Sequence, residues 1–314
     1  MGRYLLRRIG FALGVGWAAF TVSFLMLYLL PSDPVAIMAG GGPDGEPLSP
    51  AQLDELRARY GLDQPLVVQY WHRLVAALHG DLGTSLSSGL DVRGQIEHAL
   101  PPTLEIAVAG LVFAVVFGAG LALVATYTTL RWLRQLLMSL PSLAVSLPVF
   151  WVGLMLVQLF SFQLRLLPSV GARGAESVVL PAITLGLPTG AVIAQVLAKS
   201  LAQALESPYI VTARAKGVGR VSIQLGHALR NAAMPAMTAL GHVTGSLLAG
   251  TVVVETVFTR PGLGRLTVSA VGVQDIPLVQ GIVLFAALVY VVVNLLVDLA
   301  YPLLDPRITV GATS

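Results

Sequence analysis

The chain lacks cysteine altogether and has few charged residues for its length. None of its 314 residues is Cys, and Asp, Glu, Lys and Arg together make up 11%. The absence of cysteine excludes a disulfide framework, thiolate metal sites and a cysteine nucleophile. Soluble chains average about 25% charged residues, so this chain cannot cover its whole surface with polar groups. The hydrophobic fraction of 55% and the mean hydropathy of +0.80 therefore predict that much of its surface faces lipid.

Several catalytic motifs are missing as well. The sequence has no Walker-type glycine-rich loop followed by Lys and Ser or Thr, no HExxH zinc motif and no Gly-x-Ser-x-Gly elbow. An intramembrane hydrolase using His242 with Asp298 is an alternative, but no nucleophile and base stand at a recognisable spacing. We therefore expect that the chain is not an enzyme and holds no metal or cofactor of its own.

About six apolar segments are long enough to cross roughly 30 Å of hydrocarbon. They cover residues 9–30, 103–127, 136–160, 179–200, 233–257 and 278–302. The first follows a basic head and lacks a small-residue cleavage site, which favours a retained helix over a signal peptide. The fourth is interrupted by Pro181 and Pro188, so we expect a kinked helix packed inside the bundle, where neighbours satisfy the freed backbone groups.

The basic residues fix the expected orientation, because short cytoplasmic loops carry an excess of Lys and Arg. Ten of them fall on one side: Arg3, Arg7, Arg8, Arg131, Arg134, Arg214, Lys216, Arg220, Arg230 and Arg307. This side is the expected cytoplasm, so both termini are cytoplasmic and residues 31–102 form a long first external loop. Within that loop, Ser49 followed by Pro50 predicts a helix start with Ser49 as N-cap.

The expected cytoplasmic segment 201–232 is the most informative part of the sequence. Two short helical pieces around a glycine-containing turn would lie across the cytoplasmic face. Small Ala and Thr side chains permit close docking into a groove of a partner, and Arg214 and Lys216 add steering charge. On charge alone, a basic loop that obeys the positive-inside rule is the favoured interpretation of this segment.

The exact residues of this segment resemble the coupling-loop signature of ABC-importer permeases. The matching stretches are 209–217 and 227–235, in which Ala213 and Gly217 keep the Ala and Gly of the general pattern and Val211 replaces its usual Glu. Further stretches resemble the first permease subunit of dipeptide, oligopeptide and nickel importers. They are residues 3–8, 30–34, 60–65, 69–70, 80–85, 100–105, 254–264 and 298–307, so the resemblance covers nearly the whole chain.

The resemblance implies an all-α membrane protein, one transmembrane domain over residues 1–314, with the type I ABC importer (MetI-like) permease fold. It also implies a bacterial plasma (inner) membrane location. The implied partners are a second permease subunit, two cytoplasmic ATPase subunits that carry ATP and Mg²⁺, an extracytoplasmic substrate-binding protein and the lipid bilayer, with no nucleic acid. The implied contacts with the ATPase are Tyr209, Thr212, Ala213, Arg214, Ala215, Lys216 and Gly217.

Polar residues inside the apolar segments are costly and count as functional candidates. His242 and Glu255 in the fifth segment are candidates for the pathway or gate, and Glu255 could instead pair with Arg260 or Arg265. For Glu105, near a membrane interface, we favour capping or pairing.

The implied function is half of the translocation pathway of an ATP-driven importer of di- or oligopeptides. Two alternatives stay open: the same architecture importing nickel or a metal chelate, and a proton-coupled secondary transporter. The secondary transporter should show internal symmetry and midplane carboxylates, for which Asp298 is the one candidate.

Overall fold

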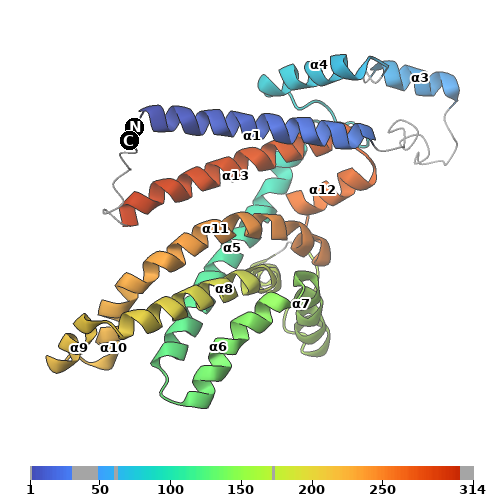
Figure 1. Ribbon diagram of the computed structural model, residues 1–314. Helices are drawn as coiled ribbons and strands as arrows, with labels where there is room; N and C mark the ends of the chain where they lie inside the picture. Colours follow the sequence, from blue (N-terminus) through green and yellow to red (C-terminus); the bar gives the residue numbers. More distant parts are fainter. Residues whose placement is uncertain (1, 30–48, 60–62, 172–173, 305–314) are drawn as a thin grey trace. The chain divides into compact units, whose positions relative to one another are not determined.

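The computed structural model describes residues 2–29, 49–59, 63–171 and 174–304, which are almost entirely helical (Figure 1). The helices are α1 (Gly2–Leu29), α3 (Pro50–Arg59), α4 (Leu66–Leu78), α5 (Val92–Tyr127), α6 (Arg131–Ser146), α7 (Val149–Leu156), α8 (Glu176–Leu205), α9 (Pro208–Ala215), α10 (Arg220–Ser222), α11 (Leu229–Val257), α12 (Leu263–Gly272) and α13 (Ile276–Leu304). Two π-helical stretches, η1 (Val157–Gln163) and η2 (Ile223–Ala228), follow α7 and α10. The expectation of an all-α protein is confirmed.

Among the described residues, three helices are long and apolar enough to cross a membrane: Val92–Tyr127, Glu176–Leu205 and Ile276–Val293. The number of spans rises to five if each of two bent helix pairs counts as one span. These pairs are Arg131–Ser146 with Val149–Gln163, and Arg220–Gly241 with Gly245–Val257. The first expected segment corresponds to α1, a helix of 28 residues whose described part includes the apolar stretch Leu13–Met26.

The third expected segment, 136–160, is not one straight helix. It breaks after α6, and the stretch formed by α7 and η1 is bent by 106° from α6. Leu147 and Pro148 have extended backbone angles (ψ 131° and 133°), because the residue before a proline is pushed out of the helical region. The apolar pattern predicts a helix, but it cannot show a change of direction at a proline.

The second expected segment starts earlier than its apolar run. α5 begins at Val92 rather than at 103, and the Asp91 carboxylate accepts the Gly94 N–H at 2.8 Å as a cap. The predicted start at Ser49 is confirmed for α3: the Ser49 hydroxyl and N–H both donate to the Gln52 side chain, at 2.9 Å each.

The chain divides into two compact units: residues 1–101 with 262–292, and residues 102–261 with 293–314. In the first unit, Asp275 is fully buried and precedes α13. Its carboxylate accepts hydrogen bonds from the Ser85 and Ser87 hydroxyls, from the N–H groups of Leu86 and Ser87, and from the Leu278 N–H. It thus caps α13 and fixes the 85–88 segment over the apolar cluster that includes Val92 and Ile276.

In the second unit, α8 is the central helix and contacts α6, α7 and α11 (Figure 1). Two-thirds of its apolar window (67%) is buried, so the expected packing of this segment inside the bundle is confirmed. Pro181 and Pro188 lie inside one continuous helix. Gly118 of α5 allows the backbone of Gly190 to approach so closely that an added Cβ would lie 2.5 Å from the Gly190 carbonyl oxygen.

Candidate functional site

The helix α9 is the centre of the candidate site, and its residues explain its start. Ser207 has extended backbone angles (φ −70°, ψ 148°), and Pro208 occupies the first helical position, where a missing N–H costs nothing. Ile210 and Ala213 are buried, whereas Tyr209, Val211 and Thr212 are exposed. The short helix therefore has one face packed on its own chain and one face open.

The end of α9 is a Schellman motif. The Val218 N–H donates to the Ala213 carbonyl at 3.1 Å, and the Gly217 N–H donates to the Arg214 carbonyl at 2.9 Å. Gly217 has a φ of +78°, a left-handed conformation that glycine adopts without steric cost. Beyond Gly217 the chain reverses into α10, so the predicted pair of short helical pieces around a glycine turn is confirmed.

An apolar cluster joins α9 to the ends of the long helices. Its buried members come from α5, α8, α9, η2 and α11: Ala122, Leu197, Ala198, Leu201, Ala204, Ile210, Ala213, Ile223, Ala228, Ala232 and Ala236. Seven of them are alanines, so backbones approach closely across the cluster. Movement of α9 is thus opposed by close packing against α5, α8 and α11.

Polar contacts secure the same connection. The Gln224 amide, 5% exposed, donates to the Leu123 carbonyl at 2.8 Å and to the Thr126 hydroxyl at 2.9 Å. The Arg220 guanidinium lies 4.4 Å from the centroid of the Tyr127 ring and donates to the Tyr127 carbonyl. These contacts attach α10 and η2 to the end of α5.

The Asn231 amide donates to the Tyr209 hydroxyl at 3.1 Å, which attaches α9 to the start of α11. Of the residues that make these polar contacts, the sequence indicated Arg220 only as a positive charge and did not indicate Gln224. A lone glutamine in a basic segment gives no signal of its partners on a helix about 100 residues away.

The outer surface of this region is both apolar and basic. Val211 is 62% exposed and Val221 is 55% exposed, and the side chains of Arg214 and Lys216 are also exposed. Val221 also lines a groove of about 710 Å³, together with other residues of α10 and η2, Gly219 and Tyr127. Exposed apolar side chains beside positive charges are suited to a partner surface with a complementary groove and negative charge.

The predicted contact residues divide into two groups. Tyr209, Thr212, Arg214, Ala215, Lys216 and Gly217 are exposed. Ala213 is 7% exposed and belongs to the apolar cluster. Its side chain is therefore turned toward the chain itself and packs within this cluster.

The two pathway or gate candidates lie on α11. The side chain of His242 lies outside the described residues. Glu255 is fully buried, and its carboxylate accepts the Thr103 hydroxyl at 2.6 Å. Its backbone carbonyl accepts the Arg260 N–H at 2.9 Å. The expected pairing of Glu105 is present, since its carboxylate accepts the Arg260 guanidinium at 2.6 Å.

Within the described part of the chain, no group of three or more His, Asp or Glu residues is placed to hold a metal ion. The side chain of Asp298 lies outside the described residues.

Comparison with known proteins gives consistent matches along the chain. Residues 114–310 match the family model described as binding-protein-dependent transport system inner membrane component. Residues 1–107 match the model of the N-terminal part of such membrane components. Together, these two models cover both ends of the chain and its candidate site.

Curated relatives match over nearly their whole length. The glutathione transport system permease protein GsiC of Escherichia coli strain K12 is 39% identical over 312 residues, covering 98% of this chain and 99% of the relative. The protein of the same name from Salmonella typhimurium strain LT2 is 39% identical over 309 residues, with the same coverage of both chains. Among solved structures, a chain of an amino acid ABC transporter crystallised with histidines matches with a TM-score of 0.52 and 17% identity, covering 69% of this chain and 95% of that chain. This structural similarity supports the fold alone.

Proposed function

Because the chain belongs to the family of inner membrane components of binding-protein-dependent transport systems, we propose that it forms half of the translocation pathway of an ATP-driven importer. A second permease subunit supplies the other half. Two cytoplasmic ATPase subunits bind ATP and Mg²⁺, and an extracytoplasmic binding protein delivers the substrate. This chain performs no catalysis, and both of its termini face the cytoplasm.

The observation that carries this proposal is the construction of α9. Its inner face is packed through Ile210 and Ala213, and its outer face exposes Val211 beside Arg214 and Lys216. A partner docked on the outer face would move α9 as a rigid body, because the apolar cluster and the Asn231 hydrogen bond to Tyr209 leave it little freedom of its own. The Gln224 hydrogen bond attaches the following η2 to α5. The movement would pass to α5, α8 and α11 and open the pathway alternately to each side.

For the substrate we propose glutathione or another small peptide, because the curated relatives are named glutathione permeases. A nickel chelate is the alternative substrate class for the same architecture. The test is uptake of labelled glutathione, a labelled dipeptide and nickel into vesicles that contain the complete importer with its binding protein. Uptake of nickel without uptake of either peptide would overturn the peptide assignment.

The docking role of α9 can be tested by cross-linking, since the chain contains no native cysteine. Val211→Cys places one thiol on the exposed face of α9, and Val170→Cys, at a residue that is 59% exposed, is the control on the expected external side. With the co-expressed ATPase subunits, a bifunctional thiol reagent should cross-link the first variant and not the second. Absence of a cross-link from Val211→Cys, or equal cross-linking of both, would contradict the docking role.

The energy source separates this proposal from a proton-coupled transporter. Uptake into the vesicles should require ATP on the cytoplasmic side and should persist when a protonophore abolishes the proton gradient. Uptake that follows the proton gradient without ATP would exclude the importer mechanism.

A further inference from the structure

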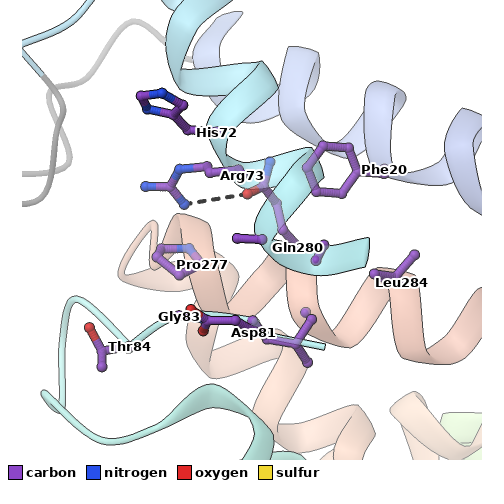
Figure 2. A pocket seen from close by; sticks show the side chains of 13 residues that line it. Phe20, His72, Arg73, Asp81, Gly83, Thr84, Pro277, Gln280 and Leu284 are labelled. Carbon is purple, nitrogen blue, oxygen red and sulfur yellow. Dashed lines mark hydrogen bonds between the residues drawn. The ribbon is translucent and has the colours of Figure 1, made fainter. Parts of the chain in front are cut away.

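The first unit contains a polar cavity that the transport mechanism does not use. It has a volume of about 300 Å³ and lies between α4, the 81–84 segment and the start of α13 (Figure 2). Its polar lining includes His72, Arg73, Asp81 and Gln280. This volume is at the lower end of the range typical of small-ligand pockets, so the cavity is suited to a small polar group.

Gln280 carries a buried donor with no acceptor. The side chain is 5% exposed, and its oxygen Oε1 accepts a hydrogen bond from Arg73 Nη1 at 3.4 Å. Its nitrogen Nε2 is buried and has no hydrogen-bond partner within the described chain. Since buried polar groups are almost always hydrogen-bonded, this nitrogen marks a position for an oxygen that the described residues do not supply.

The cavity presents charges of both signs. Figure 2 shows Arg73 on one side of the cavity and Asp81 on the other. The carboxylate oxygen Oδ1 of Asp81 accepts the Gly83 N–H at 2.8 Å, which fixes the carboxylate and leaves its second oxygen as an acceptor. A guanidinium and a carboxylate in one cavity complement a ligand that is itself zwitterionic.

An apolar groove continues from the polar cavity. It has a volume of about 390 Å³ and shares Phe20, Ala77 and Leu284 with the cavity. From there it runs along α1 and α13, where Trp17 and Leu288 line it. Both helices are apolar along this stretch, so the groove lies on surfaces suited to hydrocarbon. A soluble peptide would leave the groove empty, whereas a hydrocarbon chain would fill it.

The helix α4, which carries Arg73, is built like a helix at a membrane interface. Tyr70 attaches it to α1, because its hydroxyl lies 2.8 Å from the Thr21 hydroxyl and its ring packs against Phe20 and Phe24. On its open side, Trp71 is 61% exposed and Leu78 is 74% exposed. Exposed tryptophan and leucine on an amphipathic helix are typical of the boundary between headgroups and acyl chains.

We propose that the cavity and the groove together bind a phospholipid with a phosphoethanolamine headgroup. The phosphate lies at Arg73 and accepts the unpartnered N–H of Gln280. The ammonium group lies at the free oxygen of Asp81, and one acyl chain occupies the groove beside Trp17 and Leu288. The lipid would then fasten α4 to α1 and α13.

The test is binding of phosphatidylethanolamine to the purified, delipidated full chain, measured by native mass spectrometry. Arg73→Gln should weaken binding by about 10- to 100-fold, the factor expected for a hydrogen bond to a charged group. The matched control is Arg93→Gln, because Arg93 is an exposed arginine of the same unit paired with Glu97. Arg73→Lys keeps the charge and should therefore bind the lipid more tightly than Arg73→Gln. Such a difference would show that the loss of binding in Arg73→Gln is not caused by misfolding.

Headgroup and chain are tested separately. Wild-type protein should prefer phosphatidylethanolamine over phosphatidylglycerol, which lacks the ammonium group, and Asp81→Asn should remove this preference while keeping an oxygen for the Gly83 N–H. Glycerophosphoethanolamine and glycylglycine, which lack acyl chains, should not displace the lipid. Equal binding by Arg73→Gln and Arg93→Gln, no headgroup preference in the wild type, or displacement by either soluble compound would each overturn the proposal. None of these outcomes depends on transport, so the proposed function is judged independently.

Discussion

The guanidinium of Arg260 donates to the carboxylate of Glu105 across 2.6 Å, and the Arg260 side chain is fully buried whereas that of Glu105 is 49% exposed. Arg260 also donates to the Ser177 carbonyl at 3.1 Å and to its hydroxyl at 3.2 Å. This cluster links α5, the start of α8 and the segment after α11. A buried guanidinium needs a counter-charge, since an unpaired charge in a low-dielectric interior is strongly unfavourable.

Replacing Glu105 should therefore destabilise the protein. We expect Glu105→Gln to lower the free energy of unfolding by about 1–3 kcal/mol, less than for a fully buried pair because solvent screens the exposed carboxylate. Thermal unfolding in detergent measures the change. Glu97→Gln is the control, because Glu97 pairs with Arg93 on the surface (62% and 69% exposed) and should have almost no effect. Equal melting temperatures for the two variants would show that the Arg260 charge is compensated elsewhere.

The Schellman turn at Gly217 should be necessary for coupling. Gly217→Ala places a side chain at φ +78°, which costs roughly 1–2 kcal/mol although no atom lies within 4 Å of the added Cβ. Transport per ATP hydrolysed should fall by about 5-fold, the factor that corresponds to 1 kcal/mol, while membrane insertion is unchanged.

Gly219→Ala is the matched control for this prediction, since Gly219 also has open space around its Cβ position but a φ of −65°. It should couple normally. Bulkier residues at Gly217 should uncouple at least as strongly as alanine. Normal coupling in Gly217→Ala would remove α9 from the transmission path.

The approach of α5 to α8 depends on glycine. Gly118→Ala would bring its Cβ within 2.5 Å of the Gly190 carbonyl oxygen, so the two helices must separate. We expect a destabilisation of about 1–3 kcal/mol, as for other overpacked sites. Gly120→Ala on the same helix has nothing within 4 Å and should be tolerated. Comparing the thermal unfolding of the two variants in detergent tests the close approach, and equal stability would contradict it.

The buried carboxylate of Asp275 should hold the 85–88 segment in place. Asp275→Asn removes the charge that Ser85, Ser87 and Leu86 donate to, which should cost about 2–3 kcal/mol. Hydrogen exchange at the amides of Leu86 and Ser87 should accelerate. Asp91→Asn is the control, because Asp91 caps α5 through a single bond to the Gly94 N–H and asparagine caps as well as aspartate. Unchanged exchange in Asp275→Asn would show that packing alone holds the segment.

The sequence could have revealed part of this anchor. Asp275 stands directly before the apolar run of α13, with Pro277 at its second position, which is a helix-start signal. The two serines that share the carboxylate lie about 190 residues earlier. Their pairing depends on the fold, so no local pattern indicates it.

What the sequence determined by itself is the class of the protein and the place of α9, the helix that we propose for coupling. Apolar run length depends only on local composition, and the cap residues Ser49, Pro208 and Gly217 act within one or two turns of chain, so these features could be predicted. The coupling role of residues 209–217 is a proposal that rests on their resemblance to a family pattern.

Only the tertiary structure decided which faces point inward and which charges meet. In the folded chain, Ala213 packs in the apolar cluster and the third apolar segment bends at Pro148. Arg260 pairs with Glu105, which lies 155 residues earlier in the sequence. The tertiary structure also joined Arg73 and Gln280 at one cavity across 207 residues. The physical reason is that burial, ion pairing and helix direction depend on residues that are distant in sequence but close in space. Hydropathy and helix capping depend on residues that are adjacent in sequence.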